Sequence, residues 1–298
     1  MRLIQQTDDM TVHGLNMLIY GDPGIGKTTL ANTAPNPLLL DFDRGLHRSS
    51  HRKNAVQFDS WSDVVASAQD LTKLIAQHDT IIIDTAGTII EYMQQYLTEQ
   101  NPGLLRNGIK LWGETKRLFS EFFTPLKMSG KNVIFIAHAK EKEEGDVRIK
   151  RPLIPGSSYD LLMQSCDLVG YYTTIGNRRV LTFDLSDQIV AKNCAEIQPV
   201  YVDNLHEMAS AMSAIIDHTK TTIAKRSKDQ EQAIATIQEW IGKADASKDP
   251  NKFMHDMSKA GLSDNIKRAL WAGIVNKFKA RGYEWSKELS KFEGVQSA

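Results

Sequence analysis

The chain has 298 residues, 41% of them hydrophobic, and its 36 Lys and Arg residues balance 36 Asp and Glu residues, so its formal net charge is zero. This composition excludes a mostly disordered or fibrous chain. The zero net charge excludes a protein that coats nucleic acid simply by being basic, although it leaves room for a local basic patch. The two cysteines, Cys166 and Cys194, lack the spacing of a metal site and are typical of a protein of the reducing cytoplasm.

The N-terminal residues 1–9 lack the apolar core of a signal peptide. Nowhere does the sequence reach the ~18 consecutive apolar residues of a membrane-spanning helix. We therefore expect a cytoplasmic protein with no membrane partner. The length suits a main domain of about 200 residues with a smaller one attached.

Over the first 200 residues short apolar runs alternate with helical patterns, which predicts an α/β fold with a mostly parallel sheet. Strands are expected at Leu15–Tyr20, Pro37–Asp41, Thr80–Asp84, Asn132–Ala137, Asp167–Thr173, Arg179–Asp184 and Gln188–Lys192. Helices are expected at Trp61–His78, Ile89–Glu99, Ile109–Met128 and Tyr159–Cys166, with a break at Pro125 left open. A hairpin turn is expected at Asn177–Arg178.

Beyond residue 203 the sequence pattern predicts helix for nearly the whole chain. Helices are expected at Leu205–Lys220, Asp229–Lys243, Asn251–Ala260 and Ser263–Ala280. We therefore predict a core over 1–203 and a helical C-terminal region over 204–298, with a linker near 220–228 and a small all-helical module over 229–298. Residues 225–298 hold 14 Lys and Arg against 10 Asp and Glu. Their apolar spacing favours the core of a helical bundle, with base stacking by the aromatic residues as the alternative.

A phosphate-binding loop stands between the first expected strand and a helix. The nine residues that form it are Gly21, Asp22, Pro23, Gly24, Ile25, Gly26, Lys27, Thr28 and Thr29, which match G-x-x-x-x-G-K-[ST]. The glycines let backbone N–H groups cradle phosphate oxygens at the start of the helix. Lys27 is expected on the β- and γ-phosphates and the Thr28 hydroxyl on Mg²⁺. Nucleotide binding is the firmest expectation from the sequence.

The apolar strand Thr80–Asp84 ends in an acid, so Asp84 is expected to hold Mg²⁺ opposite Thr28. The next residue is Thr85, and not the Glu that many AAA+ motors and helicases carry there. Residues 84–87 also match the D-T-A-G of small GTPases. The sequence lacks the N-K-x-D motif that reads guanine, which disfavours a GTPase.

Three further segments follow the phosphate loop: Leu-Asp-Phe-Asp-Arg-Gly-Leu at 40–46, Ile-Ala-His-Ala-Lys at 136–140 and Ile-Pro-Gly-Ser-Ser at 154–158. In this order they resemble the core of RecA-like ATPases over residues ~12–200. The resemblance is strongest to phage and prophage nucleotide-binding proteins of the RecA-like single-strand annealing family. It implies a RecA-like P-loop NTPase core.

The resemblance also implies roles for single residues. Asp43 would polarise the attacking water, and His138 would sense the γ-phosphate and couple it to a mobile loop over 141–156. In that loop Arg148, Lys150 and Arg151 would contact single-stranded DNA. Lys192 would reach the ATP of a neighbouring subunit. Each role has an alternative. Asp43 would then be a loop acid or a helix cap, and His138 a plain strand-end histidine. The loop over 141–156 would be solvated without a partner, and Lys192 would be an ordinary surface lysine.

The function expected from the resemblance is an ATP- and Mg²⁺-dependent, single-stranded-DNA-binding ATPase that supports phage recombination by annealing or strand exchange. Its expected partners are single-stranded DNA, further copies of itself in a ring or filament, and a single-strand-binding protein. If phage-encoded, it would act in the bacterial host cytoplasm. The main alternative is an ATP-binding loader or regulator of a replication or repair protein. A small-molecule kinase is a third class, which no lid-like arginine cluster supports.

Overall fold

The computed structural model describes residues 12–145, 147–202 and 208–294. The expectations for residues 1–9 and for a helix start at Leu205 lie outside these ranges. The chain divides into two compact units, one of residues 11–223 and one that contains residues 224–298. Among the described residues, no helix is long and apolar enough to cross a membrane.

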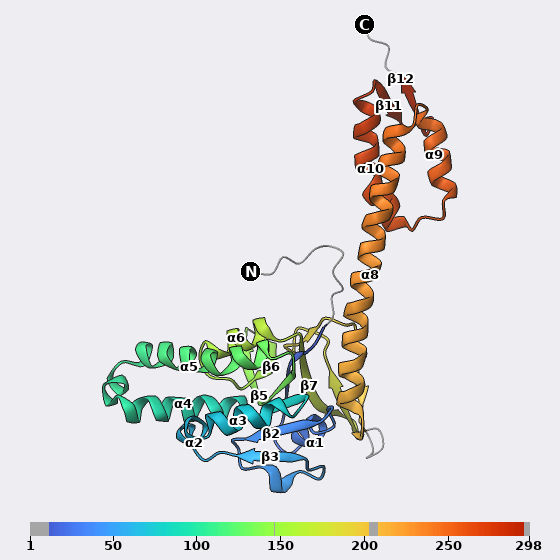
Figure 1. Ribbon diagram of the computed structural model, residues 1–298. Helices are drawn as coiled ribbons and strands as arrows, with labels where there is room; N and C mark the ends of the chain where they lie inside the picture. The colour runs from blue at the N-terminus through green and yellow to red at the C-terminus, as the bar shows by residue number, and fades with distance from the viewer. Residues whose placement is uncertain (1–11, 146, 203–207, 295–298) are drawn as a thin grey trace. The chain divides into compact units, whose positions relative to one another are not determined.

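The first unit is built on a mostly parallel sheet (Figure 1). Its strands follow the order β10-β8-β7-β1-β5-β4-β2-β3, with β6 paired to β5 and β9 paired to β7. The strand bounds are β1 Asn16–Gly21, β2 Pro37–Asp41, β3 Asn54–Gln57, β4 Thr80–Asp84, β5 Asn132–Glu144, β6 Val147–Pro152, β7 Leu168–Ile175, β8 Arg178–Thr182, β9 Lys192–Asn193 and β10 Val200–Tyr201. Strands β6, β8, β9 and β10 run antiparallel to their partners. The predicted α/β class is confirmed.

Strand β1 is buried on both faces because helices cover both sides of the sheet. Leu18 and Tyr20 pack into one apolar cluster with α2 to α6, whereas Met17 and Ile19 pack into another with α1 and the first turns of α8. This two-sided burial explains the uninterrupted apolar strand runs in the sequence. The helix bounds are α1 Lys27–Ala31, α2 Trp61–Ala66, α3 Ala68–Ala76, α4 Ala86–Gln100, α5 Gly108–Met128, α6 Ser158–Ser165 and α8 Ala211–Ala246, with short 3₁₀ helices η1 Leu46–Arg48 and η2 Pro102–Arg106.

One expected helix differs in detail from the structure, and for another the structure answers a question that the sequence left open. The helix expected over Trp61–His78 is divided into α2 and α3 at Ser67, whose backbone leaves helical geometry. By contrast, α5 continues through Pro125 without a break.

The segment expected as a mobile loop over 141–156 is instead largely a β-hairpin. Strand β5 continues past His138 to Glu144, and β6 returns antiparallel to it. Opposite charges face each other across the pair: the Glu141 carboxylate lies 2.6 Å from the Lys150 ammonium, and the Glu143 carboxylate lies 3.3 Å from the Arg148 guanidinium. Such cross-strand pairs stabilise a polar hairpin that carries no apolar signal in the sequence.

The boundary between the two units lies near residue 223, later than the predicted 203/204. Met208, Met212 and Ile215 are buried in the apolar cluster of the first unit, so the start of α8 belongs to the core. The linker expected near 220–228 lies inside α8, which runs unbroken from Ala211 to Ala246.

The second unit has its own apolar centre, formed by the end of α8 with α9 Pro250–Lys259 and α10 Asp264–Lys279. Phe278 is fully buried there, and its ring packs against Phe253 and Phe292. A small hairpin, β11 Tyr283–Ser286 and β12 Lys291–Gly294, completes the unit, so the module is not all-helical as expected. These buried rings form a core, the reading that the apolar spacing favoured.

Candidate nucleotide-binding site

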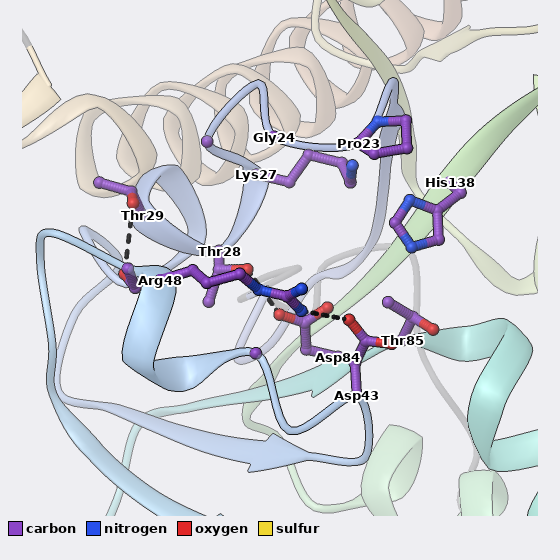
Figure 2. Close-up of a pocket in the computed structure, with 13 residues that line it drawn as sticks. Pro23, Gly24, Lys27, Thr28, Thr29, Asp43, Arg48, Asp84, Thr85 and His138 are labelled. Atoms are coloured by element: carbon purple, nitrogen blue, oxygen red, sulfur yellow. Dashed lines mark hydrogen bonds and ion pairs between the residues drawn. The ribbon is translucent and has the colours of Figure 1, made fainter.

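A cavity of about 480 Å³ lies where β1, β2, β4 and β5 end (Figure 2). Parallel strands bring their carboxyl ends to one edge of the sheet, which is where ligands bind in open α/β folds. The lining residues are Pro23, Gly24, Gly26, Lys27, Thr28, Thr29, Asp43, Gly45, Arg48, Ser49, Asp84, Thr85 and His138. The sheet thus brings together the phosphate loop and the predicted Asp43, Asp84 and His138.

The phosphate loop connects β1 to α1 and needs glycine at two positions for different reasons. Gly21 lies so close to β7 that a Cβ atom there would stand 2.1 Å from the Tyr172 carbonyl oxygen. Gly26 caps α1 with a φ of 102°, in the left-handed region that other residues rarely adopt. The loop therefore keeps a backbone path that few other residues would allow.

The Lys27 ammonium is folded back onto its own loop. It donates hydrogen bonds to the carbonyl oxygens of Gly21 at 2.9 Å and Asp22 at 2.8 Å. Burial lowers the pKa of Lys27, and the nearby carboxylates, Asp84 foremost, oppose that shift. The lysine is thus held at the cavity by acceptors that phosphate oxygens can replace.

Thr28 and Asp84 lie side by side at one point of the cavity. The Thr28 hydroxyl donates to the Asp84 carboxylate at 2.6 Å. Burial raises the pKa of Asp84 to about 6, while the hydrogen bond from Thr28 works in the opposite direction. The Asp84 carbonyl accepts the backbone N–H groups of Phe42 and Asp43, so it also fixes the loop that follows β2.

Thr85 occupies the position after Asp84. Its hydroxyl oxygen accepts the backbone N–H of Thr88 and caps the N-terminus of α4. Thr85, at the position where many AAA+ motors carry a glutamate, therefore has a structural role as the N-cap of α4.

Asp43 lies at the cavity and is paired. Its carboxylate accepts a hydrogen bond from the Arg48 guanidinium at 2.9 Å, drawn as a dashed line in Figure 2. No sequence pattern singled out Arg48, because its place depends on how the loop after β2 folds back.

His138 stands on β5 opposite Gly21 and is half-buried. Burial and the charge of Lys27 lower its pKa, which favours the neutral imidazole. Its Nδ1 atom is buried and has no hydrogen-bond partner within the described part of the chain. Nitrogen atoms of this kind are normally satisfied, so Nδ1 is a candidate to bind a ligand or water.

The three predicted DNA-contacting residues lie on the β5–β6 hairpin, outside the cavity lining. Arg148 and Lys150 are the residues paired with Glu143 and Glu141. Arg151 lies on the opposite face, with its guanidinium 4.2 Å from the centre of the Tyr159 ring. The structure therefore separates the three cations between two faces of the hairpin.

Lys192 lies away from the phosphate loop of its own chain. It pairs with Val169 on β7, level with the middle of β1, and its ammonium donates to the Cys166 carbonyl oxygen at 2.5 Å. The strand expected over 188–192 shortens to β9, because the preceding residues make only isolated bridges.

Arg179 is a second arginine that the sequence did not reveal. It lies on β8, and its guanidinium donates to the Ile25 carbonyl oxygen at 3.5 Å. A Cβ atom on Gly26 would stand 3.2 Å from the same guanidinium. Arg179 thus braces the phosphate loop from a strand that is distant in sequence.

The glycine-rich loop after β1, its lysine and threonine, and the strand-end Asp84 define a P-loop ATPase. Strand β5 lies between the phosphate-loop strand β1 and the Asp84 strand β4 in a mostly parallel, RecA-like core. Residues 13–195 match the family AAA_24, described as an AAA domain, and the chain belongs to this family. That membership implies a nucleotide-binding P-loop domain.

The proteins that this chain resembles include a prophage protein and a protein of known structure. The chain is 31% identical over 173 residues to the SPbeta prophage-derived uncharacterized protein YorG of Bacillus subtilis (strain 168), a match that covers 52% of each protein. The chain thus spans about half the length of this relative. The flagellar accessory protein FlaH of Methanocaldococcus jannaschii aligns with 64% of this chain and 85% of its own, at 14% identity and a TM-score of 0.34.

Proposed function

We propose that this protein is an ATP- and Mg²⁺-dependent ATPase of phage origin that binds single-stranded DNA and supports recombination by annealing or strand exchange. The prophage origin of the relative YorG supports the phage assignment, which would place the protein in a bacterial host cytoplasm. The ATPase class comes from the family, and the proposed DNA-binding role rests on the hairpin.

The residues at the cavity fit a nucleotide with Mg²⁺. Mg²⁺ prefers hard oxygen donors, and the Thr28 hydroxyl and the buried Asp84 carboxylate supply them at one point of the cavity. When bound, the ion would neutralise charge on the β- and γ-phosphates. Lys27 would exchange its two carbonyl acceptors for phosphate oxygens, Asp43 would orient the attacking water, and His138 would offer its unpaired nitrogen to the γ-phosphate.

One observation carries the DNA-binding proposal: β5 runs without interruption from His138 at the cavity into the basic hairpin. The His138 carbonyl accepts the backbone N–H of Leu153 at 2.7 Å, beyond the end of β6. The Tyr20 hydroxyl, next to the phosphate loop, donates to the Lys150 carbonyl at 3.0 Å. A shift at the γ-phosphate can therefore reach both strands of the hairpin.

The hairpin has one face better suited to phosphate than the other. Lys140 lies opposite Arg151 in the register, and Lys142 follows on the same face. The other face carries the Glu141–Lys150 and Glu143–Arg148 ion pairs. Because those pairs largely cancel their charge, we expect the face that carries Lys140 and Arg151 to contact DNA phosphates.

We further propose that the ATPase assembles into a ring or filament, with Lys192 acting on the ATP of the next subunit. For that role its ammonium must leave the Cys166 carbonyl. A cation supplied in trans would stabilise the transition state and make hydrolysis depend on assembly.

The proposal is tested by the ATPase rate with and without single-stranded DNA, in the full-length protein and in Lys27→Ala. We expect DNA to stimulate hydrolysis and Lys27→Ala to abolish it. Hydrolysis that is unaffected by single-stranded DNA, in a protein that also fails to bind it with ATP present, would contradict the DNA-binding role.

That result would favour the alternative, an ATP-binding loader or regulator with a protein partner. One observation supports this class: apolar side chains stand in solvent where α4 and α5 meet, with Leu105 70% and Ile109 90% exposed. Exposed apolar residues gathered at one place often mark protein contacts.

A further inference from the structure

The loop between β2 and β3 carries three arginines, of which Arg44 and Arg48 have different surroundings. Arg44 pairs with Asp59 on the outside of the loop, whereas Arg48 pairs with Asp43 at the cavity. The loop that presents them is fixed by Asp41, whose carboxylate oxygens accept the backbone N–H groups of Gly45 and Leu46, each at 3.1 Å.

The Arg48 side chain extends across the nucleotide cavity. Figure 2 shows it reaching past Thr28 toward Asp43, on the same side as the Asp84 carboxylate. Gly45 gives it room, because a Cβ atom there would stand 2.7 Å from the Arg48 guanidinium. The next residue, Ser49, contacts the Thr29 hydroxyl at 3.2 Å, which ties the base of the arginine to the first helical turn after the phosphate loop.

The charges at the cavity require a second cation. Apart from His138, whose neutral form is favoured, the titratable groups in its lining are Lys27 and Arg48 against Asp43 and Asp84. Without Arg48, Lys27 and the Mg²⁺ of the nucleotide would be the only positive charges in this lining against two carboxylates and a triphosphate. The planar guanidinium also binds two oxygens of a phosphate at once, which a single ammonium does not.

The Arg48–Asp43 pair is well suited to exchange partners. Arg48 is 64% and Asp43 33% exposed, and ion pairs so open to water are weak. A γ-phosphate carries more charge than a carboxylate and offers more acceptor oxygens. It would therefore compete successfully for the guanidinium.

We propose that Arg48 is a γ-phosphate-binding residue that holds Asp43 in an ion pair until ATP arrives, and that its transfer to the γ-phosphate releases the Asp43 carboxylate to orient water. The inference rests on the proposed roles of the cavity and of Asp43, and it is independent of DNA binding. ADP lacks the γ-phosphate, so Arg48 would stay on Asp43 when ADP is bound.

The test compares the affinities of AMP-PNP and ADP, each with Mg²⁺, in the wild type, Arg48→Ala, Arg48→Lys and Arg44→Ala. We expect Arg48→Ala to weaken AMP-PNP binding by roughly 10- to 100-fold and to leave ADP binding within about twofold. Arg48→Lys should restore part of the difference. Arg44→Ala, the matched control from the same loop, should change neither affinity.

A double-mutant cycle with Asp43→Asn tests the release of Asp43. Removal of Asp43 should tighten AMP-PNP binding more in the wild type than in Arg48→Ala, because only the wild type has an arginine to free. An equal effect of Arg48→Ala on both nucleotides, no effect on either, or no coupling in the cycle would overturn the inference. If the wild type bound no nucleotide, or Lys27→Ala bound it normally, the nucleotide site itself would fail, which is a distinct result.

Discussion

At the scale of single residues, Asp84 is a buried carboxyl group whose ionised form is destabilised in the folded protein. Burial raises its pKa to about 6, whereas the unfolded chain has an ordinary aspartate. Between about pH 4 and pH 6 the folded state therefore binds more protons than the unfolded state. The free energy of unfolding falls as pH rises through that interval, and the loss is complete above it.

Asp84→Asn should reverse this loss. The amide oxygen can still accept the Thr28 hydrogen bond, but it carries no buried charge. We expect the free energy of unfolding at pH 7.5 to rise by about 3 kcal/mol, and most of the gain to vanish at pH 4. Urea denaturation of the wild type and the variant at the two pH values measures this difference in the free energy of unfolding. A variant less stable than the wild type at pH 7.5 would contradict the argument, and ATP hydrolysis should be lost in either case.

The unpaired Nδ1 atom of His138 leads to a second expectation. His138→Gln keeps a neutral hydrogen-bonding group and should retain most of the ATPase rate. His138→Ala should lower the rate roughly 100-fold, the typical loss of one group that stabilises developing charge. Steady-state kinetics measures the ATPase rates of the two variants. Equal rates for His138→Gln and His138→Ala would show that His138 is a plain strand-end residue with no role in hydrolysis.

Lys27, Thr28 and Asp84 could be predicted because short motifs with fixed spacing place them. Asp43 and His138 could be located because both follow apolar strands of a parallel sheet. Arg48 could not, since its position depends on the turn that Asp41 stabilises and on the space left by Gly45. Arg179 reaches the phosphate loop from β8, a contact that sequence order does not reveal.

At the scale of elements, β2 and β4 begin and end where the apolar runs predicted. Strand β3, Asn54–Gln57, was missed because it lies at the sheet edge and lacks an apolar run. The β5–β6 hairpin was missed for a related reason: cross-strand ion pairs stabilise it, and a sequence of mixed charges and glycine reads as a loop.

The two faces of the hairpin allow a charge-matched comparison. Lys140→Ala with Arg151→Ala, and Arg148→Ala with Lys150→Ala, each remove two positive charges from the same element. We expect the first pair to weaken single-stranded DNA binding more and to reduce the slope of log affinity against log salt by about 1 to 2. Titrations at several salt concentrations test this. A larger effect of the second pair would assign the DNA contact to the ion-paired face.

At the scale of the whole molecule, the zero net charge separates into two parts. Residues 225–298 carry four more cations than acids, and residues 1–224 carry four fewer. The sequence shows a change from alternating strand and helix patterns to helix patterns after residue 203, but it does not show the boundary between the two units near residue 223. The first turns of α8 look like any amphipathic helix, and only the folded core shows that their apolar side chains belong to the first unit.

Two truncations test this boundary. A fragment of residues 1–223 should fold and bind ATP, because it keeps Met208, Met212 and Ile215 in the apolar cluster. A fragment of residues 1–203 should not fold, since each lost side chain contributes about 2 kcal/mol and together they approach the stability of a typical domain. Circular dichroism and thermal denaturation distinguish the fragments. A stable 1–203 fragment would contradict the assignment of α8.

The central claim is that nucleotide at the cavity controls DNA affinity through β5 and its hairpin. The most direct test is the affinity for a fluorescent single-stranded oligonucleotide, measured by anisotropy without nucleotide, with ADP and with AMP-PNP, each with Mg²⁺. We expect AMP-PNP to change the affinity by at least about tenfold relative to ADP, a coupling within the usual allosteric range, and Lys27→Ala to abolish the difference. The same affinity in all three states would contradict the claim.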